Sequence, residues 1–348
     1  MHVPDGFLDV PTSIATGVVS AATIAVALKK SRQELDEKTA PMAGLTAAFV
    51  FAVQMLNFPV GVGTSGHLMG GALAAVLVGP WTAVLVLSVV LTVQALVFAD
   101  GGLTALGTNI LLIGIVTVLV GWLVSKAVLR LMPTKPTSVV PASFVGALVS
   151  VPAAAAVFVL LYMVGGATEL PFGALMATML GWHTLIGLGE AVITAATVGA
   201  VVAVRPDLVY AARGLQPALV LKGADGSTIC APEPIEPGAP VHGRSPWPVV
   251  IAGLGVAFLF AGVLSFFASS NPDGLEYVAG SEGFLERARD SAVGEFVLAD
   301  YGEVGGVPVG VAGLVGVGLT ILLGLALFGW IGRRGSRAQS TPPQPAQV

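Results

Sequence analysis

Nine apolar segments separated by short polar stretches run along the chain. Most of them approach the roughly 20 residues that an α-helix needs to cross a bilayer. They lie at residues 12–29, 40–56, 67–79, 81–99, 104–125, 139–164, 178–204, 247–268 and 307–332. The pattern therefore predicts an all-α polytopic membrane protein with about nine transmembrane helices.

The third segment differs from the others in length. Residues 67–79 end at Gly79-Pro80 and would rise only about 20 Å as a helix. The preceding stretch, 57–66, is rich in glycine and has no helical pattern. Irregular backbone at membrane depth is tolerated only where protein or a water-filled cavity covers it. We therefore expect a short helix that begins below the membrane surface, with His67 at the floor of a cavity.

The lysine and arginine residues indicate the orientation, because positive residues gather in short cytoplasmic loops. If all nine segments cross and Met1 lies outside, only Arg287 and Arg289 fall on the outer side. The inner side then holds Lys29, Lys30, Arg32, Lys38, Lys126, Arg130, Lys135, Arg205, Arg213, Lys222, Arg244, Arg333, Arg334 and Arg337. We expect the N-terminus outside and Val348 in the cytoplasm.

Composition agrees with a membrane location and excludes some chemistry. Hydrophobic residues make up 55% of the chain and charged residues 10%, whereas about a quarter of a soluble domain is charged. The single cysteine, Cys230, excludes a disulfide framework and a cysteine-based metal cluster.

A proline-rich stretch divides the chain into two units. Residues 1–204 form a predicted seven-helix bundle, and 205–246 a cytoplasmic linker that contains Cys230 and His242, to which we assign no role. Residues 247–332 form a two-helix unit around an external loop, 269–306, and 333–348 a disordered tail. The loop is acidic, so it either concentrates cations at the entrance or is merely a solvated segment.

The first two residues carry a pattern suited to metal chelation. The terminal amine, the amide of His2 and the imidazole of His2 can close two fused chelate rings on one metal ion. A fourth nitrogen from His67 would complete a square, which suits Ni(II) or Cu(II). The Pro4-Asp5-Gly6 turn predicts a terminus that folds back. Because no basic signal-peptide region precedes the first apolar segment, we expect the mature chain to start at Met1.

Two further ionisable residues, His183 and Glu190, lie in the seventh apolar segment. They are seven residues apart, about two helical turns, and so share one face. Ionisable residues inside a membrane are functional candidates. A pair of buried polar anchors is an equally good interpretation, and support of a metal ligand is a third.

Several motifs together resemble the CbiM/NikM substrate-binding (S) components of energy-coupling factor transporters. They are MHVPDGFL at residues 1–8, GTSGHLMGGAL at 63–73, GPW at 79–81, QA at 94–95, DGG at 100–102 and HTLIGLGEA at 183–191. The PDGLE string at 272–276 matches the signature of the CbiN/NikN small subunit, including its two helices around an outside loop. The resemblance covers nearly the whole chain apart from the linker and the tail.

This resemblance implies high-affinity uptake of Ni(II) or Co(II), with nickel slightly favoured, by a chain that is not an enzyme and holds no resident cofactor. It implies that Met1, His2 and His67 hold the metal. It further implies a membrane coupling subunit of the CbiQ/NikQ type and ATP-binding subunits of the CbiO/NikO type as partners. The chain itself has no phosphate-binding Gly-x-x-x-x-Gly-Lys-Ser/Thr loop. Ala21 and Ala25, four residues apart, are candidates for docking the coupling subunit.

An alternative from another class is an intramembrane serine protease. The string Gly63-Thr64-Ser65-Gly66 would supply a nucleophile, Ser65, and His183 a base. Such a pair has to be within hydrogen-bonding reach. The hypothesis leaves Met1-His2 and the PDGLE string unexplained. A metal-responsive sensor is weaker still, because no recognisable output segment follows the last helix.

Overall fold

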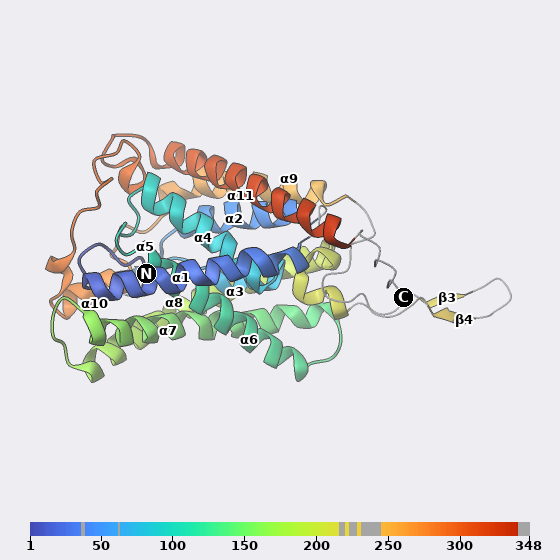
Figure 1. Cartoon of the computed structure of the whole chain (residues 1–348), viewed down its shortest axis with the longest axis horizontal. Coiled ribbons are helices and arrows are strands. Elements are labelled where there is room, and N and C mark those ends of the chain that lie inside the picture. Colours follow the sequence, from blue (N-terminus) through green and yellow to red (C-terminus); the bar gives the residue numbers. More distant parts are fainter. Residues whose placement is uncertain (36–38, 62, 216–219, 223–227, 231–244, 340–348) are drawn as a thin grey trace, which may run out of the picture.

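The computed structural model describes residues 1–35, 39–61, 63–215, 220–222, 228–230 and 245–339. Within them, long helices run roughly side by side and their connections gather at two ends (Figure 1). One end, which we call the cavity end, holds the N-terminal residues 1–9 and the segment between the last two long helices. At the opposite end, α1 and α11 finish.

The N-terminal unit is built from six helices of 14 to 33 residues. They are α1 (Val10–Lys30), α2 (Ala40–Gln54), α4 (Pro80–Val97), α6 (Thr117–Arg130), α7 (Val139–Gly165) and α8 (Phe172–Val204). The short helix α5 (Leu106–Asn109) and a π-helix, η2 (Ile110–Val116), run directly into α6. Helix α7 packs along both α6 and α8. Proline opens α1, α2 and α4 within their first two positions, where its missing N–H costs no hydrogen bond.

The region around His67 differs from expectation in one respect. Residues 57–66 are not irregular, because β1 (Phe58–Gly61) pairs with β2 (Thr64–Gly66) as an antiparallel hairpin. The pairing satisfies backbone hydrogen-bonding groups of both strands. The expected short helix is present as α3 (Gly71–Val78), whose eight residues are all buried. It rises about 12 Å and is surrounded by α2, α4, α6 and α7.

The C-terminal unit consists of α9 (Trp247–Gly262), α10 (Gly274–Ser281) and α11 (Val309–Gln339). Helices α9 and α11 pack along α2 and so attach this unit to the bundle. Helix α11 continues beyond residue 332 into the segment predicted to be a disordered tail, because its helical hydrogen bonding extends to Gln339. Residues 340–348 of that tail lie outside the described residues, as does His242 of the linker. Within the linker, β3 (Val220–Lys222) pairs with β4 (Thr228–Cys230).

The all-α membrane class is confirmed. In the described part of the chain, six helical segments are long and apolar enough to cross a membrane. Helices α2 and α9 are apolar but shorter, and α3 is shorter again. Each of the nine predicted apolar segments coincides with helix, although the count of nine crossings is not confirmed.

Candidate functional site

The first nine residues, which we call the N-terminal arm, are threaded into the cavity end of the bundle. Val3 is fully buried and its main chain is held by Asn109, which accepts from the Val3 N–H at 2.7 Å and donates to the Val3 carbonyl at 3.1 Å. The Gly102 N–H donates to the same carbonyl at 2.9 Å. Asn109 is the last residue before the π-helix, a distortion that is common at functional sites. The arm therefore has a fixed position.

Asp5 fixes the arm at a second point. Its carboxylate accepts hydrogen bonds from the Leu103 N–H at 3.1 Å, the Thr104 N–H at 2.8 Å and the Thr104 hydroxyl at 2.5 Å. These donors lie just before α5, so the carboxylate ties the arm to the loop after α4. The sequence-predicted turn at residues 4–6 thus has a structural purpose, because it turns the Asp5 side chain toward the bundle.

The three predicted metal ligands lie together. The Met1 amino group contacts Nε2 of His67. The rings of His2 and His67 stack with centroids 4.9 Å apart and planes inclined by 7°. The other nitrogen of His67, Nδ1, faces the Leu68 carbonyl at 3.0 Å. Nε2 of His67 is therefore directed at the terminal amine, as a shared metal ion requires.

Glu190 holds the backbone that follows His67. It is fully buried, and its two oxygens accept from the Met69 N–H at 2.7 Å and the Gly70 N–H at 3.1 Å. Gln54 of α2 donates to the Met69 carbonyl at 2.9 Å. These contacts are those of a buried polar anchor, and because they hold the backbone next to His67 they also agree with support of the predicted metal ligand.

His2 is oriented by Asp100, which follows α4. Its Nδ1 lies 2.8 Å from Asp100 Oδ1, and its Nε2 is buried without a hydrogen-bond partner. The Tyr301 hydroxyl donates to the other oxygen of Asp100 at 2.5 Å. Chelation through Nδ1 requires a half-turn of the imidazole about its Cβ–Cγ bond, which would turn the partnerless Nε2 toward the Asp100 side.

Residues 269–306, which we call the lid, cover the site from the C-terminal unit. Three main-chain hydrogen bonds attach the lid to the rest of the molecule. The Pro272 carbonyl of the lid accepts from the Ser65 N–H at 2.9 Å. The lid's Arg289 N–H donates to the Asp5 carbonyl at 2.8 Å, and its Asp300 N–H donates to the Phe98 carbonyl at 2.8 Å. Asp273, the acidic residue of the PDGLE string, brings Oδ2 to 2.9 Å from the Met1 nitrogen. The external loop predicted from sequence is thus in contact with the candidate metal ligands.

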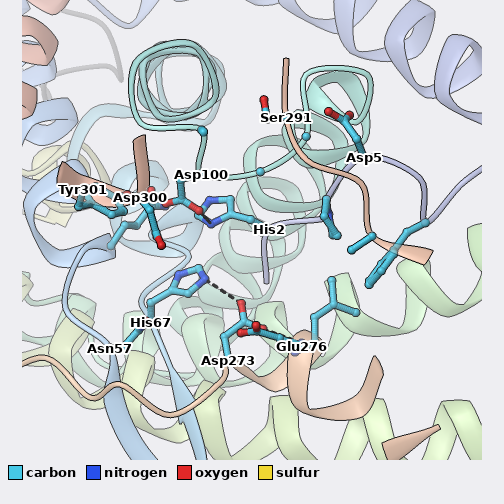
Figure 2. Close-up of a pocket in the computed structure, with 18 of the residues that line it drawn as sticks. His2, Asp5, Asn57, His67, Asp100, Asp273, Glu276, Ser291, Asp300 and Tyr301 are labelled. Carbon is cyan, nitrogen blue, oxygen red and sulfur yellow. Dashed lines mark hydrogen bonds and ion pairs between the residues drawn. The ribbon is translucent and has the colours of Figure 1, made fainter. Parts of the chain in front are cut away.

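Arm, lid and bundle enclose a cavity of about 380 Å³ lined by several acidic side chains (Figure 2). Burial alone would raise the pKa of Asp100, but the neighbouring His2 lowers it below its usual range. The pKa of Asp273 is likewise lowered against the effect of burial, chiefly by the terminal amine. Both side chains are therefore carboxylates at neutral pH, and the cavity attracts cations.

Side chains alone do not form a metal site here. Among the residues that the structure describes, no three His, Cys, Asp or Glu side chains are grouped so as to hold a metal ion. The Met1-His2 pattern adds two donors that are not side chains, the terminal amine and the His2 amide nitrogen.

The geometry required by the protease hypothesis is missing. Ser65 donates through its hydroxyl to the Asn271 carbonyl at 2.7 Å, and Nδ1 of His183 faces the Met179 carbonyl at 2.8 Å. No hydrogen bond joins these two side chains in the described part of the chain. Nε2 of His183 has no partner and lies beside Gly274 of the lid. A nucleophile activated by a base is therefore not formed.

Fold and site together define a class: a polytopic membrane protein with nitrogen donors and carboxylates enclosed at one end of its helices. The family described as "Cobalt uptake substrate-specific transmembrane region" (CbiM) matches residues 2–208, and the PDGLE domain matches residues 247–333. The chain therefore belongs to the CbiM family and carries a PDGLE domain at its C-terminal end. The family resemblance seen in the sequence is confirmed.

Relatives and solved structures agree with this membership. A candidate fused nickel transport protein NikMN from Archaeoglobus fulgidus is 34% identical over 94% of this chain and 98% of its own length. A cobalt transport protein CbiM from Geobacter sulfurreducens is 35% identical over 38% of this chain and 39% of its own. The crystal structure of a transition metal transporter has a TM-score of 0.50 and 30% identity, covering 58% of this chain and 92% of that chain. The chain is a transition-metal transport protein of the cobalt/nickel type.

Proposed function

We propose that this protein captures Ni(II) or Co(II) as the substrate-binding component of an energy-coupling factor transporter. The observation that carries the proposal is the convergence of the Met1 amine, the His2 ring and His67 Nε2 at one end of the bundle. Two chelate rings from Met1 and His2 and one nitrogen from His67 would place four nitrogens around the ion. The ion is the substrate and leaves again.

Capture follows from the charges and donors of the cavity. The carboxylates attract the hydrated cation, and the amine and the His2 amide lose protons when they bind it, so capture releases protons. The half-turn of the His2 ring supplies Nδ1 to the ion and directs Nε2 to the side of Asp100. A ligating histidine that donates its second N–H to a carboxylate is held in one orientation and is a stronger ligand.

We propose nickel as the preferred ion. Four nitrogens in a plane suit Ni(II) better than Co(II). The fused relative from Archaeoglobus fulgidus and a fused nickel transport protein NikMN from Rhodobacter capsulatus, 41% identical over 33% of each chain, carry nickel in their names. Competition between the two ions for the purified chain tests this preference, and tighter binding of cobalt would contradict it.

The proposed partners are a coupling subunit of the CbiQ/NikQ type and ATP-binding subunits of the CbiO/NikO type. Helix α1 supports this, because it is the least buried of the long apolar helices and leaves Ala21 and Ala25 exposed. Small residues allow a partner helix to approach closely. Leucine at both positions should abolish metal uptake by cells while metal binding by the purified chain stays unchanged. Unchanged uptake would remove α1 as the docking face.

The proposed orientation has the N-terminus outside and the C-terminus in the cytoplasm. Lys29 and Lys30 lie in the last turn of α1 and Arg333 and Arg334 near the end of α11, at the end opposite the cavity (Figure 1), in agreement with a cytoplasmic location there. The chain provides its own probe, because Cys230 is its single cysteine. A membrane-impermeant maleimide should label it in inside-out vesicles and leave it unlabelled in intact cells. The reverse result would invert the topology.

The decisive experiment is titration of the purified, detergent-solubilised chain with Ni(II) and Co(II), followed by calorimetry and absorption. His2→Ala and His67→Ala each remove one ligand and should lower the affinity at least 100-fold, about 2.7 kcal/mol. His242→Ala removes a histidine to which the proposal assigns no role and serves as the matched control. Equal binding by all four proteins would refute the metal site and the transport proposal that depends on it.

A further inference from the structure

The carboxylate of Asp273 faces two of the proposed ligands with one of its oxygens. Oδ2 lies 2.9 Å from the Met1 nitrogen and 3.6 Å from His67 Nε2. The other oxygen, Oδ1, caps the N-terminus of α10 by accepting from the Leu275 N–H at 2.8 Å and the Glu276 N–H at 2.9 Å. The cap fixes the plane of the carboxylate, so Oδ2 has a defined direction into the site (Figure 2).

These separations fit donors that share one ion. With metal–nitrogen bonds of about 2.0–2.1 Å, neighbouring donors lie about 2.9 Å apart. Oδ2 lies at this distance from the amine and somewhat farther from His67 Nε2, so an ion held by these two nitrogens would lie within reach of the carboxylate. The four positions in the plane are taken by nitrogens, so an additional oxygen must bind above or below it.

We propose that Asp273 is an axial oxygen ligand of the transported ion, so that the C-terminal unit completes the metal site of the N-terminal unit. This inference rests on the proposed function. The deprotonated His2 amide and the Asp273 carboxylate would balance the two charges of a divalent cation among its direct ligands, and Asp100 beside His2 adds a further negative charge. That balance matters at a buried site, where an uncompensated charge is costly.

The lid is seated closely enough to hold a ligand in place. A Cβ atom on Gly274 would lie 2.6 Å from Cδ1 of Ile186 on α8, so the lid approaches the bundle closely at this residue. On the other side of Asp273, the Pro272 carbonyl accepts from the Ser65 N–H at 2.9 Å, two residues before His67. Asp273 is thus fixed relative to both α8 and the segment that carries His67.

The fifth donor has a spectroscopic consequence. Ni(II) with four planar nitrogens alone is yellow and diamagnetic, whereas axial oxygen ligation makes it five-coordinate and paramagnetic. Co(II) accepts five ligands readily, so the carboxylate also reduces the advantage that a planar site gives to nickel. Asp273 would therefore set both the spin state of bound nickel and the selectivity between the two ions.

The test compares the full-length protein with Asp273→Asn and Asp273→Ser. Asparagine and serine both cap helices well, so α10 is retained, and thermal melting checks this. The magnetic susceptibility of bound Ni(II), measured by NMR, should show a paramagnetic ion in the original chain and a diamagnetic ion in Asp273→Ser. Asp273→Asn should be diamagnetic or nearly so. Both variants should favour nickel over cobalt at least tenfold more strongly than the original chain does.

Glu276→Gln is the matched control, because it removes a carboxylate from the same helix and cavity without touching the cap. It should leave the spin state and the ratio of affinities unchanged. Diamagnetic nickel in the original chain, or identical spectra and affinities in the original chain and Asp273→Ser, overturns the inference.

Failure of this inference is distinguishable from failure of the proposed function. If His2→Ala and His67→Ala lose metal while the Asp273 variants match the original chain, the four-nitrogen site stands and Asp273 is not a ligand. If neither histidine variant changes binding, the metal site itself is wrong, and the axial ligand is overturned with it.

Discussion

The N-terminal arm and the lid cover the same cavity but are attached in different ways. The arm is held by buried side chains of the bundle, among which Asn109 binds Val3 twice and Asp5 accepts three hydrogen bonds. The lid buries Leu275, Val278 and Phe284, but every one of its residues from 285 to 298 is partly or fully exposed, and that stretch is attached by main-chain hydrogen bonds at separate points. Both segments contribute to one site, yet only the arm is fixed along its length.

This difference indicates a division of labour. A ligand set that is already in position spends little binding energy on ordering itself, which suits the chelating arm. The exposed stretch of the lid, 285–298, has few buried contacts and so opens at low free-energy cost, which suits a cover that an ion has to pass. Variants that loosen the arm should therefore change affinity, whereas variants that loosen the lid should change rates.

The largest effect is expected from Asn109→Ala. The variant leaves the buried N–H and carbonyl of Val3 without their side-chain partner, so Met1 and His2 lose their fixed position. Loss of a group that supports a metal ligand typically costs 10–100-fold in affinity, and we expect about 100-fold because two ligands are displaced. Calorimetric titration with Ni(II) measures the loss.

The control for this variant is Asn271→Ala, since Asn271 is exposed and contributes a backbone carbonyl to the Ser65 contact. It should bind nickel like the original chain. An Asn109→Ala protein of unchanged affinity would mean that the arm does not depend on its clamp, and the contrast with the lid would be lost.

A smaller effect is expected from Glu190→Gln. An amide side chain retains one acceptor oxygen but places an NH₂ group against the second backbone N–H, so one of the amides of Met69 and Gly70 loses its partner. His67 alone is displaced, and we expect about tenfold weaker nickel binding. Glu169→Gln, in the exposed loop before α8, is the matched control. Equal affinities for both variants would show that Glu190 does not position His67.

The smallest effect on affinity is expected from Tyr301→Phe, which removes the hydrogen bond between the lid and Asp100. One such bond contributes about 1 kcal/mol, so release of nickel to a chelator should be about fivefold faster. Binding of nickel should also become faster, because the ion passes the same lid on its way in. The equilibrium affinity, which is the ratio of the two rates, should then change less than threefold. Stopped-flow mixing with a coloured chelator measures both rates.

Tyr277→Phe is the control on the lid, because the Tyr277 ring packs against Trp182 with centroids 4.9 Å apart and is unchanged by loss of the hydroxyl. If Tyr277→Phe also releases nickel faster, the effect belongs to the lid in general and not to the contact between Tyr301 and Asp100. Slower release in Tyr301→Phe would contradict the idea that this contact keeps the lid closed.

Much of the fold could be predicted from hydrophobic segments, because helix length and apolarity are local properties. The short α3 and the folded-back terminus were predicted as well, from Gly79-Pro80 and from the turn at residues 4–6. The hairpin at 58–66 was missed, since its strands are short and rich in glycine. Helix α11 was predicted too short, because polar residues near its end obscure a helix that continues.

The site was only partly predictable for a related reason. Met1, His2 and His67 stand out by residue type and position, and the structure brings them together. Asp100 and Asp273 belong to motifs that carry the family resemblance, but neither motif shows which ligand its aspartate contacts. Asn109 and Tyr301 are ordinary residues in the sequence, and the importance of all four comes from contacts across long sequence distances.

The attachment of both lid stems to the bundle has a kinetic consequence. The lid and the site that it closes belong to one chain, and the packing of α9 and α11 along α2 keeps the two ends of the lid next to that site. A tethered cover meets its site at an effective concentration in the millimolar range, whatever the abundance of the protein in the membrane. Closure is then a first-order event, and every copy of the protein carries its own cover in a fixed one-to-one ratio.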